Sequence, residues 1–382
     1  MGKRKFKLPG VEDLNKSQDR VLRLPENGQF LIVGGPGTGK SVVALLRVLK
    51  YQQNNKYVFL VYNHVLHSST NQLIDIRLKS FTIKSWFYKL HYHLTKELMP
   101  ELGSYKPNYD EVIAKFDNLE MKENPLHIII DEGQDMPVKF YESLISSGYE
   151  NFFIVADQNQ QITDDHSSRQ ELTDILGLEV DDVIELIENY RNSHAIGLLA
   201  GHFFTDPSSP KPELPLSSKQ SLGIPTLFKY NNYEDCGKLI LREADRDDRN
   251  LIGVVVANDT LRDTYAKTLQ EIDIKLDNPK PIISTYSSKN KEQVNIDFSN
   301  GGVVVLNDKS IKGLEFDIVF IVIDGFNIYN NDIDSMKKRF YVMSSRAIKK
   351  LVFFKSEDYK GGVEEILPTD ENILKRERLN NG

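Results

Sequence analysis

The residues with the clearest capacity for chemistry form a glycine-rich segment, Gly34-Gly35-Pro36-Gly37-Thr38-Gly39-Lys40-Ser41. It follows a short apolar run, 29–33, and precedes residues 42–49, whose apolar positions recur at helical spacing. Glycines let backbone N–H groups approach phosphate oxygens, and the N-terminus of a helix adds positive partial charge. In such a phosphate-binding loop Lys40 would reach the β- and γ-phosphates, and Ser41 would bind Mg²⁺. The segment therefore predicts binding of a nucleoside triphosphate, without specifying the reaction.

A second group of reactive side chains, Asp131-Glu132-Gly133-Gln134-Asp135, follows the apolar run 127–130. Carboxylates at the C-terminal end of a buried strand face the crevice in which α/β sheets bind ligands. Asp131 is placed to hold Mg²⁺ through its water shell, and Glu132 is placed to take a proton from the attacking water. Alone, this segment could be a solvated acidic turn. Together with the phosphate-binding loop, it predicts a site that hydrolyses a nucleotide.

The elements that must position these residues are short apolar runs separated by helical patterns. The runs are 29–33, 57–62, 126–130, 152–156, 251–257, 281–285, 303–306, 318–323 and 351–354. Runs that are apolar on both faces are typical of parallel strands covered by helices on each side, so the predicted fold class is α/β. We expect the proline-rich stretch 206–225 to be an irregular connection within or at the start of a second domain, and the polar tail 369–382 to be a frayed helix.

Length and composition limit the remaining possibilities. The 382 residues suggest two or three domains, and 40% hydrophobic with 27% charged residues suit a packed core. The net charge of −7 argues against a wholly basic DNA-coating protein but allows a local basic groove. One cysteine, Cys236, excludes an intrachain disulfide and a multi-cysteine metal site. Because no apolar run approaches about 18 residues, we expect a soluble, cytoplasmic protein with no membrane partner.

Further motifs, in order along residues 14–354, make the sequence resemble the UvrD/Rep-type helicases of superfamily one. The Asp-Glu-x-Gln-Asp segment at 131–135 is similar to that family's Walker B motif. The other matching segments are 14–18 (Q motif), 59–63 (motif Ia), 81–87 (motif Ib), 153–162 (motif III), 188–192 (motif IV), 303–316 (motif V) and 338–347 (motif VI). The resemblance is to a compact member, because the sequence has no room for the family's large accessory insertions.

This resemblance implies that ATP binds between two RecA-like domains. The first would span 1–192, with a short insertion at about 88–125, and the second 193–382. It implies that Gln18 bonds the adenine edge, Tyr190 stacks on adenine, and Gly313 and Glu315 lie at the nucleotide, with Glu315 at the ribose. The residues it assigns to catalysis are Lys40, Asp131, Glu132, Gln160, Arg191 and Arg346. Arg346 would be the arginine finger, Arg191 would touch the γ-phosphate, and Gln160 would link the γ-phosphate state to the strand site.

The expected cofactors are ATP and Mg²⁺, and the expected partner is single-stranded nucleic acid, DNA rather than RNA, with 3′→5′ movement. The residues predicted to lie along the strand are Asn63, Thr82, Ser85, Trp86 and Lys309. For Trp86, packing in the core of an amphipathic helix is an equally good interpretation. Hydroxyl groups and backbone would hold phosphates, and aromatic rings would stack on bases.

Several departures from the family pattern affect the strand-binding parts. Motif III continues as Thr163-Asp164-Asp165-His166, without the usual base-stacking aromatics, and motif V carries Asn307 and Lys309 where the family usually has Thr and His. Two functions therefore remain open: a strand-dependent ATPase that is a translocase or helicase, and an ATP-hydrolysing switch read by a protein partner such as a nuclease, without autonomous unwinding. A P-loop kinase for a small metabolite would leave motifs IV to VI without a role.

Overall fold

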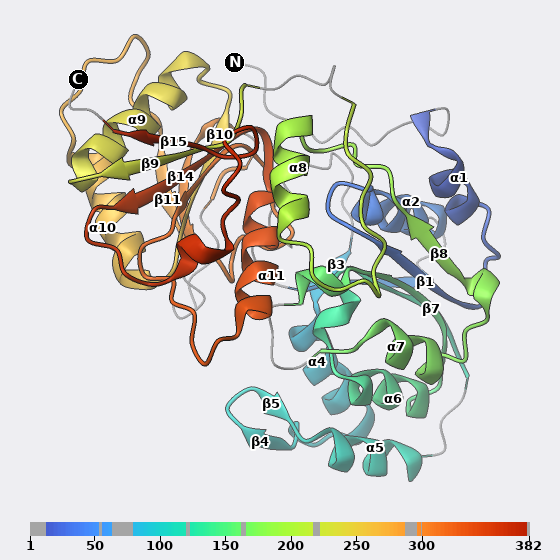
Figure 1. The fold of residues 1–382 in the computed structure, drawn as a ribbon. Helices are drawn as coiled ribbons and strands as arrows, with labels where there is room; N and C mark the ends of the chain where they lie inside the picture. Colours follow the sequence, from blue (N-terminus) through green and yellow to red (C-terminus); the bar gives the residue numbers. More distant parts are fainter. Residues whose placement is uncertain are drawn as a thin grey trace.

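Two parallel β-sheets form the framework of the chain. The structure is a computed structural model that describes residues 13–52, 56–62, 79–119, 123–161, 166–216, 222–286, 296–298 and 300–379. One sheet has six strands and the other seven, and helices cover both faces of each (Figure 1). The predicted α/β class, with two mainly parallel sheets flanked by helices, is confirmed.

The first sheet has the strand order β3-β2-β6-β7-β1-β8. Its strands are β1 (Gln29–Gly34), β2 (Tyr57–Val61), β3 (Ser80–Thr82), β6 (Asn124–Ile130), β7 (Tyr149–Ala156) and β8 (Val183–Leu186). Successive residues of a strand point to opposite faces, so Phe30 and Ile32 pack with α1 (Lys16–Leu22) and α2 (Lys40–Gln52). Leu31 and Val33 pack on the other face. The helices of that face are α4 (Ile83–Thr95), α5 (Tyr109–Asp117), α6 (Val138–Ser146) and α7 (Arg169–Ile175).

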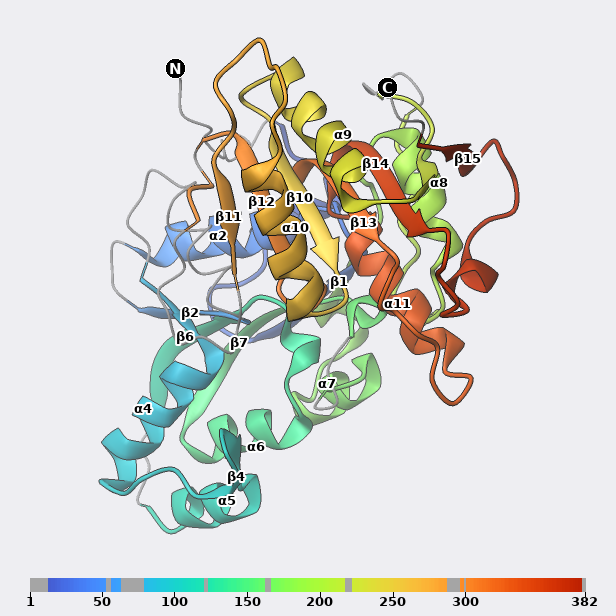
Figure 2. The same cartoon turned by 90° about the vertical axis from the view of Figure 1, so that its left-hand side faces the viewer.

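A short excursion of the chain separates β3 from β6. It contains the second half of α4, a hairpin of β4 (Glu101–Gly103) and β5 (Lys106–Pro107), and then α5. In both views this excursion lies at the end of the first sheet's domain that is remote from the second sheet (Figures 1 and 2).

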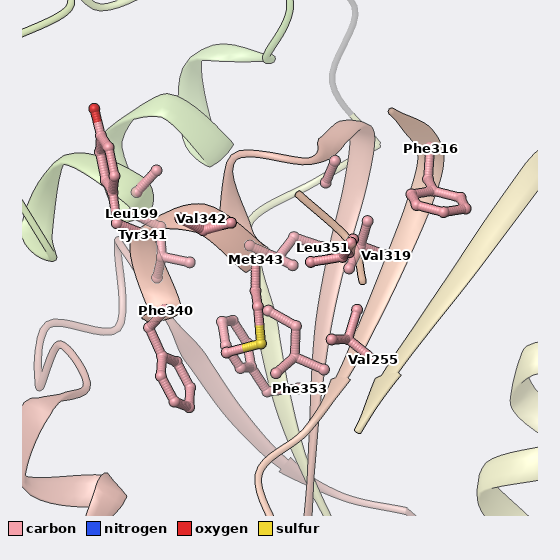
Figure 3. Packing of buried hydrophobic residues seen from close by; sticks show 14 of the residues in the cluster. Leu199, Val255, Phe316, Val319, Phe340, Tyr341, Val342, Met343, Leu351 and Phe353 are labelled. Atoms are coloured by element: carbon pink, nitrogen blue, oxygen red, sulfur yellow. The ribbon is translucent and has the colours of Figure 1, made fainter. Parts of the chain in front are cut away.

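The second sheet has the order β11-β12-β10-β13-β14-β9-β15. Its strands are β9 (Thr226–Tyr230), β10 (Leu251–Val256), β11 (Ile283–Thr285), β12 (Gly302–Asn307), β13 (Phe316–Val322), β14 (Ala347–Ser356) and β15 (Lys375–Arg378). One face is covered by α9 (Tyr233–Arg246) and α10 (Asp259–Glu271), and the other by α8 (His194–His202) and α11 (Ile333–Ser344). Figure 3 shows Phe340 and Met343 of α11 packed beside Phe353 of β14, which fixes α11 on the sheet.

Of two expectations about irregular segments, one needs correction. The tail prediction of a frayed helix is wrong, because β15 pairs in parallel with β9, with Lys375 opposite Thr226. The proline-rich segment was expected to lie within or at the start of the second domain. Residues 203–216 are irregular, as predicted, and they run back from α8 to the first sheet, where the amide of Glu213 donates to Ile187 O at 2.7 Å. Within the described ranges, no helix is both long and apolar enough to cross a membrane.

Candidate functional site

The candidate site lies where the carboxyl ends of β1, β6 and β7 face the amino ends of β13 and β14. The phosphate-binding loop connects β1 to α2, and Gly37 and Gly39 in it have φ values of 76° and 90°. A β-carbon at Gly39 would lie 2.4 Å from Gln18 Nε2. Glycine is therefore required there for both the left-handed backbone and the close neighbour. The loop presents its backbone at the N-terminus of α2, the geometry expected for holding phosphate.

Lys40 is the buried cation of this loop. Its Nζ donates to Gly34 O at 2.7 Å and to Gly35 O at 2.9 Å, and lies 3.8 Å from Asp157 Oδ2. Burial lowers the pKa of Lys40, while Asp157 and the carboxylates that end β6 oppose this shift. A phosphate oxygen on the loop would offer the ammonium group a stronger, charged acceptor than the two carbonyl groups.

The two carboxylates after β6 are buried side by side. Asp131 hydrogen-bonds Ser41, and burial together with Glu132 raises the pKa of Asp131. Glu132 has φ 59° and ψ 44°, a left-handed backbone that is rare for this residue type. Burial disfavours the charged form of Glu132, but three cations, led by Lys312, outweigh burial and hold its pKa below the usual range. Glu132 is therefore ionised and able to accept a proton.

The pair Ser41 and Asp131 fits the requirements of a phosphate-bound Mg²⁺. One hydroxyl oxygen and one carboxylate lie in hydrogen-bonding contact at the mouth of the loop. Mg²⁺ typically uses one or two carboxylates plus substrate phosphates and water rather than a cage of protein ligands.

A chain of hydrogen bonds runs from Glu132 to the second sheet. Gln134 Nε2 donates to Glu132 Oε2 at 2.8 Å, and Gln134 Oε1 accepts from the amide of Asp157 at 3.1 Å. Gln160 Nε2 donates to Asp157 Oδ2 at 2.6 Å, while Gln160 Oε1 accepts from Arg346. Every member is buried. The predicted base and the predicted arginine finger are thus joined through side chains from the ends of β6 and β7.

Arg346 precedes β14 and enters the cleft from the second sheet. Its side chain is 2% exposed, and its Nε donates to Val342 O at 3.0 Å, which fixes the guanidinium against α11. Burial and the neighbouring Arg191 lower the pKa of Arg346 to about 10, so the group stays charged at neutral pH.

Lys312 is a buried cation that the sequence interpretation did not assign to the site. It precedes β13, and its Nζ is ion-paired with Asp135, donates to Gln160 O at 2.5 Å and lies 3.7 Å from Glu132 Oε2. Lys312 thus brings a positive charge from the second sheet to the carboxylates of the first. It belongs to the same Lys-Gly-Leu-Glu-Phe segment as Gly313 and Glu315, which was the available signal.

We expect Lys312→Met to lower the free energy of unfolding by about 3–5 kcal/mol, because it leaves buried carboxylates without their cation. Urea unfolding of both variants checks this. The matched control is Lys309→Met, since Lys309 is an exposed lysine of the same loop and its loss should change stability by less than about 0.5 kcal/mol. Equal midpoints for the two variants would contradict the assigned ion pair.

Arg191 and Glu315 form an ion pair between the two halves of the chain. Arg191 Nε donates to Glu315 Oε1 at 2.8 Å, whereas Arg191 Nη1 is buried with no hydrogen-bond partner among the described residues. The hydroxyl of Tyr341 is also buried and unpartnered within those residues. A β-carbon at Gly35 would lie 3.0 Å from this hydroxyl, and one at Gly37 would lie 2.8 Å from Arg191 Cβ. Two side chains with a donor that has no partner in the described part of the chain therefore adjoin the phosphate-binding loop.

Gln18 and Tyr190 border the loop from the side of α1. Gln18 Nε2 donates to Thr38 O at 3.1 Å, and Gln18 Oε1 completes a capping box with Asn15. The amide of Tyr190 donates to Gly37 O at 2.8 Å, and its hydroxyl accepts from Asn15 Nδ2 at 2.8 Å. The Tyr190 side chain is 47% exposed, so its ring is open to a planar ligand. The two predicted adenine contacts are thus neighbours, although their roles stay predictions.

The predicted strand residues are less closely grouped. Thr82 ends β3 and is buried, Ser85 is exposed on α4, and Lys309 is exposed after β12. Trp86 is half-buried, and its ring lies 5.9 Å from that of Tyr149 within the core of the first sheet. This placement favours packing over base stacking. Asn63 lies outside the described residues, as do Thr163, Asp164 and Asp165 of the motif III continuation.

The segment 203–216 forms a further wall of the site. Asn159 Oδ1 accepts from the amide of Asp206 at 2.8 Å, and Ser209 Oγ accepts from the amide of Gln158 at 2.7 Å. Pro212 then lies directly against the loop, because a β-carbon at Gly35 would be 2.0 Å from Pro212 Cγ. The connection between the two sheets therefore contacts both motif III and the phosphate-binding loop.

Comparison with known proteins agrees with a P-loop domain in the first part of the chain. Residues 18–165 match the sequence family described as an AAA domain. This range includes the phosphate-binding loop, Asp131, Glu132 and Gln160. No curated protein sequence matches the chain.

Two solved structures share features of the fold at low similarity. One is the C-terminal domain of a possible DNA helicase from Lactobacillus plantarum WCFS1, with 15% identity and a TM-score of 0.34, covering 49% of this chain and 98% of that one. The other is the arterivirus nonstructural protein 10 (helicase), with 14% identity and a TM-score of 0.37, covering 92% of this chain. The chain spans 64% of the length of the arterivirus structure.

Proposed function

We propose that this protein is an ATP-hydrolysing motor that acts on single-stranded nucleic acid. The observation that carries the proposal is the contact of Gln160 with both Asp157, at the end of β7, and Arg346, before β14. Side chains of the proposed ATP site therefore come from both sheets, and Gln160 connects the two sets. By its resemblance to UvrD/Rep-type helicases, we further propose DNA as the strand and 3′→5′ as the direction.

In this proposal the first RecA-like domain, 1–192, holds ATP and Mg²⁺ through Lys40, Ser41 and Asp131. The second, 193–382, supplies Arg346, and Arg191 acts at the junction. Neither domain alone surrounds the γ-phosphate, so charge on the transferring group favours closure of the cleft and hydrolysis releases it. Glu132, which is held ionised, takes the proton of the attacking water. Bound Mg²⁺ would neutralise charge on the phosphates.

Repeated closure would move a strand that touches both domains. Lys312 and Arg346 enter from the second sheet and contact Gln160, so any shift of that sheet reaches the end of β7 directly. Coupling of this kind requires the strand to bind one state of the cleft, closed or open, more tightly than the other. The two affinities typically differ by roughly 5- to 150-fold.

The experiment that tests this function is steady-state ATP hydrolysis with and without single-stranded DNA and RNA of mixed sequence. We expect turnover to rise when a strand is added, because strand binding favours closure over ATP. Turnover that is equal with and without every strand would contradict a strand-dependent ATPase. The alternative, a switch that hydrolyses ATP for a protein partner such as a nuclease, would then be favoured.

A further inference from the structure

One face of α4 exposes lysines together with a tyrosine. Ser85, Lys89 and Tyr92 follow one another at intervals of four and three residues, so they align on one side of the helix. The fourth residue, Lys96, is the C-cap of α4, and its Nζ donates to the backbone oxygen of His93 at 2.8 Å. All four are exposed, and Tyr92 is 56% exposed. The opposite side of α4, with Phe87 and His91, packs into the core. This face extends from the first sheet toward the excursion that carries the hairpin β4–β5 (Figure 2).

The charge of this face is wholly positive. Residues 83–96 include Lys84, Lys89 and Lys96 and no Asp or Glu, in a chain whose net charge is −7. Lys84 and Lys89 have no ion-pair partner within the ranges that the structure describes. The nearby acidic groups are otherwise engaged, since Glu97 pairs with Lys115 and Glu101 accepts from the Tyr88 hydroxyl. Lysines that are not neutralised locally are available to an anionic ligand.

An open groove of about 430 Å³ lies along the C-terminal half of α4, on the part of this face that carries Lys89, Tyr92 and Lys96. Its lining includes Tyr92, Lys89, His93 and Lys96 from the helix, together with Leu98 beyond its end. An exposed ring flanked by cations over an apolar floor is the combination that binds single strands, because bases stack on the ring while phosphates meet the lysines. The face begins at Ser85, one of the residues predicted to contact the strand.

We infer that the exposed face of α4 is a second segment of the strand-binding surface, which continues the predicted path from Ser85 to Lys96. This inference rests on the proposed function. Tyr92 stacks on a base, and Lys89 and Lys96 contact phosphates on either side of it. The distance from Ser85 to Lys96 is roughly 16 Å along the helix, about five nucleotides at the 3.4 Å spacing of a stacked strand.

A single strand fits this face better than a protein does. Leu98 is 84% exposed and Leu102 is 70% exposed, and these apolar groups alone could serve a protein partner. Of the two only Leu98 lines the groove, however, where it lies beside the alternation of lysine and tyrosine formed by Lys89, Tyr92 and Lys96. A phosphate backbone with repeated charge matches that alternation, since each lysine meets one phosphate.

The test measures the affinity of the protein for labelled single strands of DNA of about 8 and about 20 nucleotides. Only the longer strand exceeds the length of a single compact binding site. We expect Tyr92→Ala to weaken binding of the long strand roughly 5- to 150-fold and to leave the short strand nearly unaffected. For the long strand, the logarithm of the binding constant falls linearly with the logarithm of the salt concentration. The double variant Lys89→Ala/Lys96→Ala should reduce the steepness of this slope by about 1.4, or about 0.7 for each lost phosphate contact. Hydrolysis stimulated by the short strand should stay at the wild-type rate.

Matched controls are Tyr329→Ala and Lys267→Ala, which remove exposed residues of the second sheet's domain. Both should bind the two strands as the wild type does. If the α4 variants also bind the long strand like the wild type, the inference is overturned, and a protein partner is then the favoured ligand of this face. If the wild type binds neither strand, the proposed function itself fails, which is a different result.

Discussion

Glu132→Gln is expected to stop ATP hydrolysis while leaving ATP binding close to that of the wild type. Glu132 is the carboxylate that Lys312 and the other cations keep ionised at the mouth of the loop, so it is the group able to accept the proton of the attacking water. Glutamine keeps the shape of the side chain but cannot take up that proton. We expect turnover to fall by roughly 10²- to 10⁴-fold. Phosphate release and binding of a fluorescent ATP analogue measure the two properties.

The control for this experiment is Glu150→Gln, at the opposite end of β7, where the side chain is exposed. It makes the same chemical change far from the loop and should hydrolyse ATP normally. Lys312 retains Asp135 as its ion-pair partner in Glu132→Gln, so the fold should persist. Normal turnover by Glu132→Gln would show that another group is the base.

Arg346→Ala has the second large expected effect. The guanidinium is buried, charged and hydrogen-bonded to Gln160, which places it beside the chain of side chains that leads to Glu132. Arginine fingers act on charge that develops in the transition state, and their removal slows phosphoryl transfer by roughly 10³- to 10⁵-fold. We therefore expect hydrolysis to be nearly lost at saturating ATP, with a much smaller change in ATP affinity. Single-turnover hydrolysis measures the step itself.

Two further variants separate catalysis from structure. Arg346→Lys keeps a positive charge but loses the planar fork of donors, so it should recover only part of the rate. Arg339→Ala removes a different arginine, on α11, whose Nε donates to Asp308 at 2.7 Å, and should retain hydrolysis. If Arg346→Ala hydrolyses ATP at the wild-type rate, this arginine does not stabilise the transition state. The proposal that the second domain supplies a catalytic residue to the ATP bound by the first domain is then wrong.

The sequence predicted the central strands because their side chains are apolar on both faces. β1, β6, β7, β10, β12, β13 and β14 all coincide with such runs. The short strand β8 was not predicted, since it has only four residues and exposes Glu185. β15 was mistaken for a helical tail because its residues, Lys-Arg-Glu-Arg, are charged. As an edge strand it is held by backbone pairing with β9, which leaves no hydrophobic signal.

The candidate site was predicted more completely for the nucleotide than for the contacts between domains. Local motifs identified the loop and the carboxylates, because each lies in one continuous segment. Lys312 was missed because its partner Asp135 is distant in sequence, and no local pattern marks a buried ion pair. The contact of Pro212 with Gly35 was likewise unpredictable, because a proline-rich segment indicates an irregular backbone but not the surface on which it lies.

The most direct test of the central claim is displacement of streptavidin from biotinylated single-stranded DNA, with biotin at either the 3′ or the 5′ end. A motor that moves 3′→5′ should displace streptavidin from the 5′ end only, and only with ATP and Mg²⁺. Glu132→Gln should bind the same strands and displace nothing. Displacement from neither end, by a wild-type protein that binds the strand and hydrolyses ATP, would contradict the motor and leave a nucleotide-dependent switch as the function.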